Sequence, residues 1–559
     1  MSKTIIYQLL PRLFGNVNEH RVFNGSVEEN GCGTFNDINQ AALQAIKELG
    51  CTHVWYTGVL EHASVTAYPQ ASIVGSNANI VKGKAGSPYA IRDYYDVCPD
   101  LAVDVTQRMA EFEALVQRTH KAGLKCLIDF VPNHVARDYA SDAKPSGVSD
   151  FGQNDDRSIP FSAQNNFYYF PGQDFVSPVV DLDVQYVERP ARVSGNDAFT
   201  AAPAITDWCE TVKLNYGIDY QNGGSFFDPI PDTWFKMKDI LLYWASKGVD
   251  GFRVDMAEMV PVAFWRWVIS GVKQQYPALV FVAETYDLSQ YRAYIDAGFD
   301  WLYDKDGFYN CLRSVMQGQR WASDLCSVWQ MNGDIQDRLL LFLENHDEQR
   351  LASSFFMGDG ALAKPGVLVS ALFNSRSALM LYFGQEVGEP GMDAEGFSGQ
   401  EGRTTIFDYW GIERWQQFVN HHRYDGALLP EDGCQLLDWY RLLMKAIQQY
   451  PALQAGNFYD LTWYQNRQDE YNHATVYSFL RYDETDRFLV VANFGGHNEV
   501  IRLRMPADVL AAMGLKTTGE LAGSDLFTGG VVVQGKVGAL IDEGIEIRVE
   551  SKSCFLIHF

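Results

Sequence analysis

The segment GFRVDMAEM, residues 251–259, decides the fold of this chain. It follows an amphipathic run, residues 234–248, that is typical of a helix ending at a glycine, and its own apolar start predicts a short buried strand. Arg253 and Asp255 stand two positions apart at the end of that strand, so both side chains point to the same face. Because buried charges need partners, we expect the two to pair. Such a pair fits a structural ion pair as well as a carboxylate held ionised for nucleophilic attack.

Three other apolar runs end in polar residues in the same way. They cover residues 124–134, 279–284 and 339–347, and they close on Asn133-His134, on Glu284 and on His346-Asp347. Continuous apolar runs are typical of parallel strands that helices cover on both faces. When several such strands carry polar residues at one edge, the pattern indicates a (β/α)8 barrel with its site at the C-terminal rim.

At these segments the chain resembles glycoside hydrolase family 13, the α-amylase family. The matching motifs are DFVPNH (129–134), GFRVDMAEM (251–259), VAET (282–285) and ENHD (344–347), and they occur in the family's order. The resemblance implies an α/β fold: a (β/α)8 TIM barrel with an inserted domain B after strand 3 and a C-terminal all-β sandwich domain.

The rest of the chain supports boundaries for these domains. Residues 7–14 resemble the family's opening strand, residues 136–229 lack helical or strand periodicity, and residues 462–559 alternate as strands do. We therefore predict a first part of the barrel at 1–134, domain B at 135–230, the second part of the barrel at 231–453 and the β-sandwich domain C at 454–559.

The resemblance assigns the chemistry to three carboxyl groups. Asp255 is the implied nucleophile, Glu284 the general acid/base, and Asp347 the carboxylate that holds the distorted sugar. Independently, cleavage of a glycosidic bond with retention needs an attacking carboxylate and a protonated carboxyl about 5 to 5.5 Å apart. We expect Arg253 to keep Asp255 charged, while less polar surroundings keep a proton on Glu284.

Further residues are implied as sugar contacts. The segment SPYAIRDYYDV, residues 87–97, resembles the family segment whose tyrosine stacks on the bound sugar. A single histidine is more often a core or capping residue than a ligand, so the two histidines gain weight only from their motifs. The substrate-binding candidates are Tyr89, His134, Arg253, Glu258, His346 and Arg350.

The sequence leaves open whether the protein binds a calcium ion. Many family members hold a structural calcium between domain B and the barrel, through the asparagine of the first motif and a histidine carbonyl four residues after the nucleophile. Asn133 is present, whereas Met259 stands at the histidine position, although a backbone carbonyl needs no particular side chain. The polar loop that begins at Asn16 offers oxygens for a separate ion. The chemistry itself requires no cofactor.

Composition limits the partners and the compartment. The chain has 559 residues, 47% of them apolar, and a formal net charge of −25, which argues against a nucleic-acid partner but suits a neutral sugar polymer. No apolar run is long enough to span a membrane, and Arg12 interrupts the N-terminal apolar run before a signal sequence forms. The 9 cysteines lack metal-ligand spacing and indicate reduced thiols. Together these features predict a cytoplasmic protein of undetermined oligomeric state.

The leading hypothesis is a retaining α-glucan hydrolase that cleaves α-1,4 bonds of maltooligosaccharides or cyclodextrins, with α-1,6 bonds left open. Lys213, in TVKLNY (211–216), resembles the neopullulanase and cyclomaltodextrinase group, whereas Arg350 resembles the α-glucosidases. The alternative is a transferase or isomerase such as a trehalose synthase, which uses the same carboxylates. An inactive sugar-binding subunit is a remote third reading, because such subunits usually lose a catalytic carboxylate.

Overall fold

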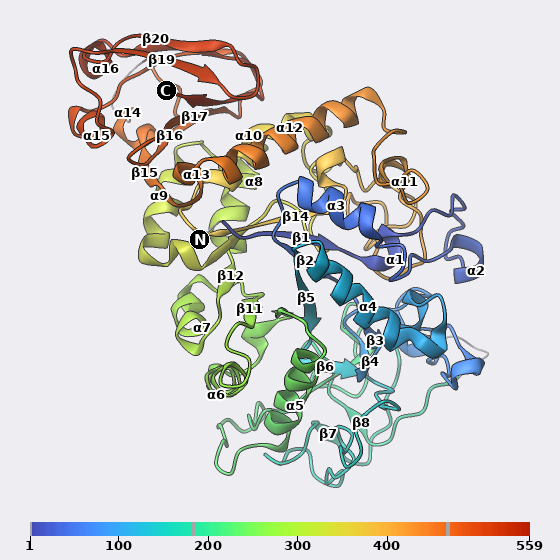
Figure 1. Ribbon diagram of the computed structural model, residues 1–559. Coiled ribbons are helices and arrows are strands. Elements are labelled where there is room, and N and C mark those ends of the chain that lie inside the picture. The colour runs from blue at the N-terminus through green and yellow to red at the C-terminus, as the bar shows by residue number, and fades with distance from the viewer. Residues whose placement is uncertain (1–2, 180–184, 466–469) are drawn as a thin grey trace.

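A closed barrel of parallel strands forms the centre of the molecule (Figure 1). The computed structural model describes residues 3–179, 185–465 and 470–559. Around the barrel the strand order is β1-β14-β13-β12-β11-β10-β5-β2, which confirms the predicted (β/α)8 fold. The barrel strands are β1 (Ile5–Leu9), β2 (His53–Tyr56), β5 (Lys125–Phe130), β10 (Gly251–Val254), β11 (Val280–Ala283), β12 (Trp301–Tyr303), β13 (Leu339–Leu341) and β14 (Ala378–Tyr382).

The strand register places the sequence motifs at one rim. Arg253 on β10 lies opposite Asp129 on β5 and Val282 on β11. Since all three strands run in the same direction, the residues that follow them emerge together at the carboxyl end of the barrel. All four residues of β10 are buried, Arg253 among them.

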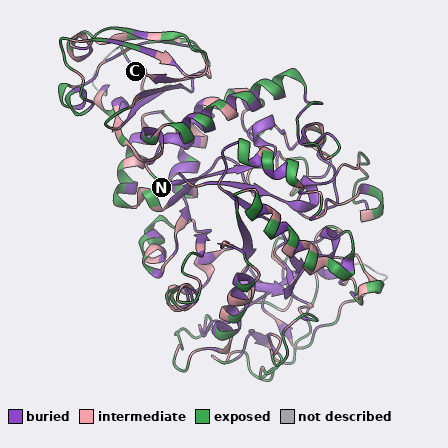
Figure 2. Ribbon diagram, in the orientation of Figure 1, coloured by how far each residue is buried: buried purple, intermediate pink, exposed green. Residues whose placement is uncertain are grey.

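Helices cover the barrel and turn their apolar faces inward, so that buried residues line the centre and exposed ones the outside (Figure 2). In α5 the buried residues Trp234, Met237, Leu241 and Trp244 follow helical spacing. The helices are α1 (Pro11–Phe14), α2 (Val27–Asn30), α3 (Gln40–Glu48), α4 (Arg108–Lys121), α5 (Asp232–Ser246), α6 (Val262–Lys273), α7 (Tyr291–Ala297), α8 (Asn310–Met316), α9 (Asp324–Asn332), α10 (Lys364–Leu372), α11 (Glu413–Val419), α12 (Glu431–Gln449), α13 (Pro451–Ala455), α14 (Leu461–Gln465), α15 (Ala507–Ala512) and α16 (Ala539–Asp542).

The predicted opening strand needs a correction. Residues 7–14 do not form one strand: β1 ends at Leu9, and α1 begins at Pro11. Proline has no amide hydrogen for the sheet, but its fixed φ suits the first position of a helix.

The long segment between β5 and α5 forms two small ribbons instead of a regular layer. They consist of β6 (His134–Ala136) with β9 (Thr211–Lys213) and of β7 (Tyr169–Phe170) with β8 (Ala191–Arg192). Buried Arg137 holds this segment together: it donates to Glu188 and to Ser194, and its guanidinium lies 3.7 Å from the centroid of the Phe175 ring. Another antiparallel ribbon, β3 (Leu60–His62) with β4 (Ile91–Val97), follows β2.

The C-terminal strands form a separate two-layer unit with a hydrophobic core of its own. It lies at one end of the molecule in Figure 1 and confirms the predicted all-β sandwich, whereas the domain boundaries at 134, 230 and 453 stay predictions. The six-stranded sheet has the order β15-β16-β17-β22-β19-β20, and β18 pairs with β21. The strands are β15 (Asn457–Asp460), β16 (Val476–Tyr482), β17 (Arg487–Asn493), β18 (Glu499–Leu503), β19 (Glu520–Asp525), β20 (Val531–Lys536), β21 (Ile545–Val549) and β22 (Cys554–His558).

A search of the described ranges for a helix with the length and apolar character of a membrane span found none. The cytoplasmic location stays a prediction.

Candidate active site

A pocket of about 380 Å³ opens at the carboxyl end of the barrel. Its wall draws on the loop between β3 and β4, on the segment between β5 and α5, and on the loop after β14. Six of the residues singled out in the sequence line it, although they come from distant parts of the chain. They are Tyr89, His134, Asp255, Glu284, His346 and Asp347.

Arg253 joins two of these carboxyl groups from beneath the pocket. Its side chain is 1% exposed; Nη1 lies 2.9 Å from Asp255 Oδ1, and Nη2 lies 2.7 Å from Glu284 Oε1. The expected Arg253–Asp255 pair is therefore present, and the same guanidinium also holds Glu284. Both carboxyl groups therefore lie within ion-pair distance of one planar guanidinium.

Two neighbours fix the orientation of Glu284. The backbone N–H of Met256 donates to Oε2 at 2.7 Å, and the Tyr286 hydroxyl donates to Oε1 at 2.7 Å. Met256 adopts the left-handed conformation, with φ at 43°, which is uncommon for a residue with a side chain. Strain of this kind clusters at functional sites, where the surroundings enforce it.

Burial dominates the electrostatics of the pocket. The pKa of Asp255 is raised well above its usual value, first by burial and then by the charge of Glu284, while Arg253 opposes the shift. Arg253 thus acts on Asp255 in the expected direction, but burial and Glu284 outweigh it. Burial also raises the pKa of Asp347 and that of Asp129 to about 6 each. One guanidinium thus faces several carboxyl groups, and we expect them to share protons near neutral pH.

His346 links the tyrosine and the third carboxylate. The Tyr89 ring stacks on it with centroids 5.1 Å apart, and the Tyr89 hydroxyl lies 2.5 Å from His346 Nε2. The same nitrogen lies 3.1 Å from Asp347 Oδ2. Burial lowers the pKa of His346 well below its usual value, so the ring is neutral. On its other side, Nδ1 accepts a hydrogen bond from the Gln8 amide, which leaves the hydrogen on Nε2.

His134 and Trp208 line the pocket from the segment between β5 and α5. Their ring centroids lie 5.3 Å apart. Burial, together with the charge of Lys213, lowers the pKa of His134 to about 3. Sequence reasoning missed Trp208, Tyr286 and Met256. Trp208 falls in a segment without periodicity, whereas Tyr286 directly follows the VAET motif, which was the available signal.

Comparisons with known proteins find similar sequences and similar folds. The model of the α-amylase catalytic domain matches residues 8–170. Over this part the chain resembles the α-amylase family. Alpha-amylase 3 of Dictyoglomus thermophilum is 22% identical over 482 residues, which cover 81% of this chain and 79% of that protein. A segment of 57 residues, 10% of this chain, is 40% identical to the α-1,4-glucan:maltose-1-phosphate maltosyltransferase of Cereibacter sphaeroides.

Solved structures share the fold across the whole chain. The maltogenic α-amylase AmyB of Thermotoga neapolitana has a TM-score of 0.62 at 19% identity and covers 100% of this chain and 98% of its own. A cyclomaltodextrinase has a TM-score of 0.63 at 19% identity, and the match covers 99% of this chain and 77% of the cyclomaltodextrinase chain. At these identities the likeness shows the fold alone.

Three of the six predicted sugar contacts do not line the pocket: Arg253, which is buried against Asp255 and Glu284, and Glu258 and Arg350. Glu258 Oε2 accepts the backbone N–H groups of Tyr286 and Asp287, at 2.9 and 3.2 Å, and so supports the loop beside Glu284. Arg350 is completely buried, and its Nη1 binds Glu344 at 2.9 Å. Neither residue is among the described residues that line the pocket. Both side chains are bound to protein groups beside the pocket, and their role as sugar contacts stays a prediction.

The calcium position at Asn133 does not fit a metal ion. Asn133 Oδ1 accepts a hydrogen bond from Lys213 Nζ at 2.8 Å, and its Nδ2 donates to the Gly195 carbonyl. Lys213 Nζ also pairs with Asp197 at 2.5 Å, while its side chain is 1% exposed. A buried ammonium group therefore occupies the place that a cation would take, and a divalent ion beside it would be repelled.

Two other places for an ion are also occupied by protein groups. The Asn16 side chain donates to the carbonyls of Asn30 and Trp410. A buried carboxyl cluster formed by Glu61, Asp93 and Asp96 lies beside β4, but Arg108 binds Asp96 through two nitrogens. We assign no ion to either place.

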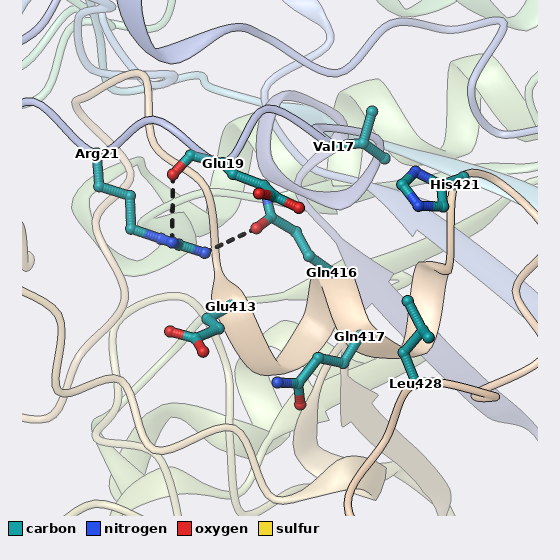
Figure 3. Close-up of a pocket in the computed structure, with 8 residues that line it drawn as sticks. All are labelled: Val17, Glu19, Arg21, Glu413, Gln416, Gln417, His421 and Leu428. Atoms are coloured by element: carbon teal, nitrogen blue, oxygen red, sulfur yellow. Dashed lines mark hydrogen bonds between the residues drawn. The ribbon is translucent and has the colours of Figure 1, made fainter.

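A second hollow, of about 330 Å³, lies beside α11 on the outside of the barrel (Figure 3). There Arg21 donates to the Glu19 carbonyl and to Gln416 Oε1. None of the predicted catalytic residues contributes to it within the described part of the chain, so the candidate site is the pocket at the barrel rim.

Proposed function

We propose that this protein is a retaining α-glucan hydrolase of the α-amylase family. Its substrates are the α-1,4 bonds of maltooligosaccharides or cyclodextrins, with α-1,6 bonds as a second linkage, and its intermediate is a covalent glycosyl-enzyme. The observation that carries the proposal is the placement of Asp255 and Glu284 on the two terminal nitrogens of Arg253, inside a pocket that Asp347 also lines. Retention needs two carboxyl groups about 5 to 5.5 Å apart, and two carboxyl groups held by one guanidinium are compatible with that spacing.

The roles follow from the contacts of each carboxyl group. Asp255 attacks the anomeric carbon, while Glu284 donates its proton to the glycosidic oxygen; Glu284 then removes a proton from the water that releases the sugar. The two groups share one guanidinium. The reaction uses the state in which Asp255 is ionised and Glu284 carries the proton.

The remaining polar groups hold the sugar that is cleaved. Asp347 is 32% exposed toward the pocket and offers a carboxylate to sugar hydroxyls. The neutral His346 ring donates from Nε2, and the Tyr89 ring supplies an apolar face. These contacts would stabilise the positive charge and the distorted ring that develop in the transition state.

A transferase of the same family is the second candidate. Trp208, Phe397 and Phe407 give the pocket apolar walls that hinder the entry of water to a glycosyl-enzyme. In that case a second sugar takes the place of water, and no other catalytic residue changes. The presence of Asp255, Glu284 and Asp347 in one pocket argues against an inactive binding subunit.

Product analysis tests the proposal. Purified enzyme is incubated separately with maltotriose, maltoheptaose, β-cyclodextrin, pullulan, sucrose and maltose, and the products are identified by chromatography and NMR. Shorter maltooligosaccharides released first in the α configuration support a retaining hydrolase. Trehalose, or chains longer than the substrate, would instead support the transferase. Initial release of the β configuration would contradict a retaining mechanism.

A further inference from the structure

An ion pair that the catalytic proposal does not use closes one side of the pocket. Lys82 Nζ lies 2.9 Å from Glu210 Oε1, and both residues line the pocket. Lys82 belongs to the loop between β3 and β4, and Glu210 directly precedes β9. The pair therefore joins two segments that the chain brings in from different directions.

Glu210 keeps one oxygen without a partner. The residue is 4% exposed, yet its Oε2 makes no hydrogen bond within residues 3–179, 185–465 and 470–559. A buried carboxylate oxygen without a donor is costly and calls for an explanation. Because Glu210 lines the pocket, a ligand hydroxyl is the group that can donate to it. The Lys82 ammonium has three hydrogens and one carboxylate partner here, so it can donate to the same ligand.

The loop after β14 continues this wall. The Phe407 carbonyl accepts the backbone N–H groups of Ala85 and Gly86, both at 3.1 Å, and Lys82 Nζ lies 5.9 Å from the centroid of the Phe407 ring. Buried Arg12 donates to the carbonyls of Ile406 and Ala85, at 3.1 and 3.4 Å. The two loops are thus fixed to each other along the side of the pocket that contains Lys82.

The strand order shows which part of a substrate meets this wall. In the closed barrel β11 is opposite β1, and the neighbours of β1 are β2 and β14. Glu284 follows β11, whereas the loops that carry Lys82 and Phe407 follow β2 and β14. Since the general acid protonates the oxygen of the leaving group, the leaving group lies on the β11 side. The wall therefore faces the non-reducing side of the cleaved bond.

We propose that Lys82 and Glu210 bind the hydroxyl groups of the non-reducing terminal glucose, so that the enzyme acts at chain ends and not within chains or rings. Glu210 Oε2 accepts from one hydroxyl, and the Lys82 ammonium donates to its neighbour. The inference rests on the proposed function and narrows its substrates to linear α-glucans. A site built to hydrogen-bond hydroxyl groups discriminates strongly against ligands that lack them.

The test compares maltoheptaose glycosides whose terminal 4- and 6-hydroxyls are free or blocked by an ethylidene group. The wild-type enzyme should cleave the free substrate and process the blocked substrate and β-cyclodextrin at least about 100-fold more slowly. Glu210→Gln and Lys82→Met should each raise the KM for the free substrate about 10- to 100-fold, change kcat much less, and reduce the preference for the free end.

Lys273→Met is the matched control. Lys273 forms a lysine–carboxylate pair of similar length, 2.8 Å to Asp300, and it does not line the pocket. This variant should keep the wild-type KM and the wild-type preference for the free end. Thermal unfolding checks that all three variants are folded.

The outcomes separate this inference from the proposed function. Cleavage of the blocked substrate or of β-cyclodextrin as fast as the free chain would overturn end recognition while leaving an α-glucan hydrolase. The same holds if Glu210→Gln and Lys82→Met retain the wild-type KM and preference. If the wild-type enzyme cleaves none of these glucans, the proposed function fails and this inference fails with it.

Discussion

Gln8, the fourth residue of β1, lies with its Nε2 2.8 Å from Nδ1 of His346. The same amide donates to Thr57 Oγ1 at 3.0 Å, so its orientation is fixed. Because the amide donates to Nδ1, His346 carries its hydrogen on Nε2, the atom beside Tyr89 and Asp347. A residue of the first barrel strand thereby sets the tautomer of a pocket histidine.

Replacing Gln8 with leucine should therefore weaken catalysis more than stability. Without the amide, both tautomers of His346 become available, and the one with hydrogen on Nδ1 cannot donate to the pocket. We expect kcat/KM on maltoheptaose to fall about 10- to 100-fold, which steady-state kinetics will measure. Gln385→Leu is the control, because Gln385 is also a buried glutamine but bonds Tyr440, outside the pocket. Equal kinetic losses in both variants would refute a tautomer role for Gln8.

The ionised side chain of Asp347 should lower the free energy of unfolding above neutral pH. Its pKa is raised to about 6, so the folded protein binds this proton more tightly than the unfolded chain does. The resulting stabilisation is complete below about pH 3.8 and is lost as the pH rises through about 6. Asp347→Asn should therefore raise the free energy of unfolding at pH 8 by about 1–2 kcal/mol, an amount limited by the partial exposure of the group.

Denaturant unfolding of Asp347→Asn and wild type at pH 4 and pH 8 measures this difference. The gain should nearly vanish at pH 4, whereas activity should be lost at both pH values. A gain of equal size at the two pH values would mean that the substitution acts through packing and not through the charge.

The sequence predicted the part of the site that parallel strands organise. His134, Asp255, Glu284 and Asp347 reach one pocket because apolar runs end at the same rim. Lys82 and Glu210 could not be found in this way, since they lie in loops whose path depends on tertiary contacts such as those of Arg12 and not on periodicity. The resemblance placed Glu258 and Arg350 among the sugar contacts, whereas in the structure both bind protein groups. Their side chains form hydrogen bonds with nearby backbone and carboxylate groups, and no periodicity in the sequence indicates such contacts.

The ammonium of Lys213 should replace calcium in holding the segment between β5 and α5. Removal of metal by a chelator should leave the thermal midpoint of the wild-type protein unchanged. Lys213→Ala should lower the free energy of unfolding by about 1–3 kcal/mol, because Asn133 and Asp197 lose their shared partner. Lys144→Ala, which breaks the half-buried pair with Asp150, should cost about 1 kcal/mol or less. A midpoint that falls with chelator and recovers with calcium would contradict this assignment.

Glu284→Gln should separate substrates by the quality of their leaving groups. The amide still accepts from Met256 N–H, but it cannot donate a proton as a carboxylic acid does. An activated aryl α-glucoside needs little protonation, so its glycosyl-enzyme should still form, whereas cleavage of maltotriose should fall by a factor on the order of 10³ or more. Burst kinetics with the aryl substrate and product analysis with maltotriose measure the two effects. Asp255→Asn provides the comparison, because it removes the nucleophile and should abolish turnover of both substrates alike. If Glu284→Gln lost both activities equally, Glu284 would not be acting as the proton donor.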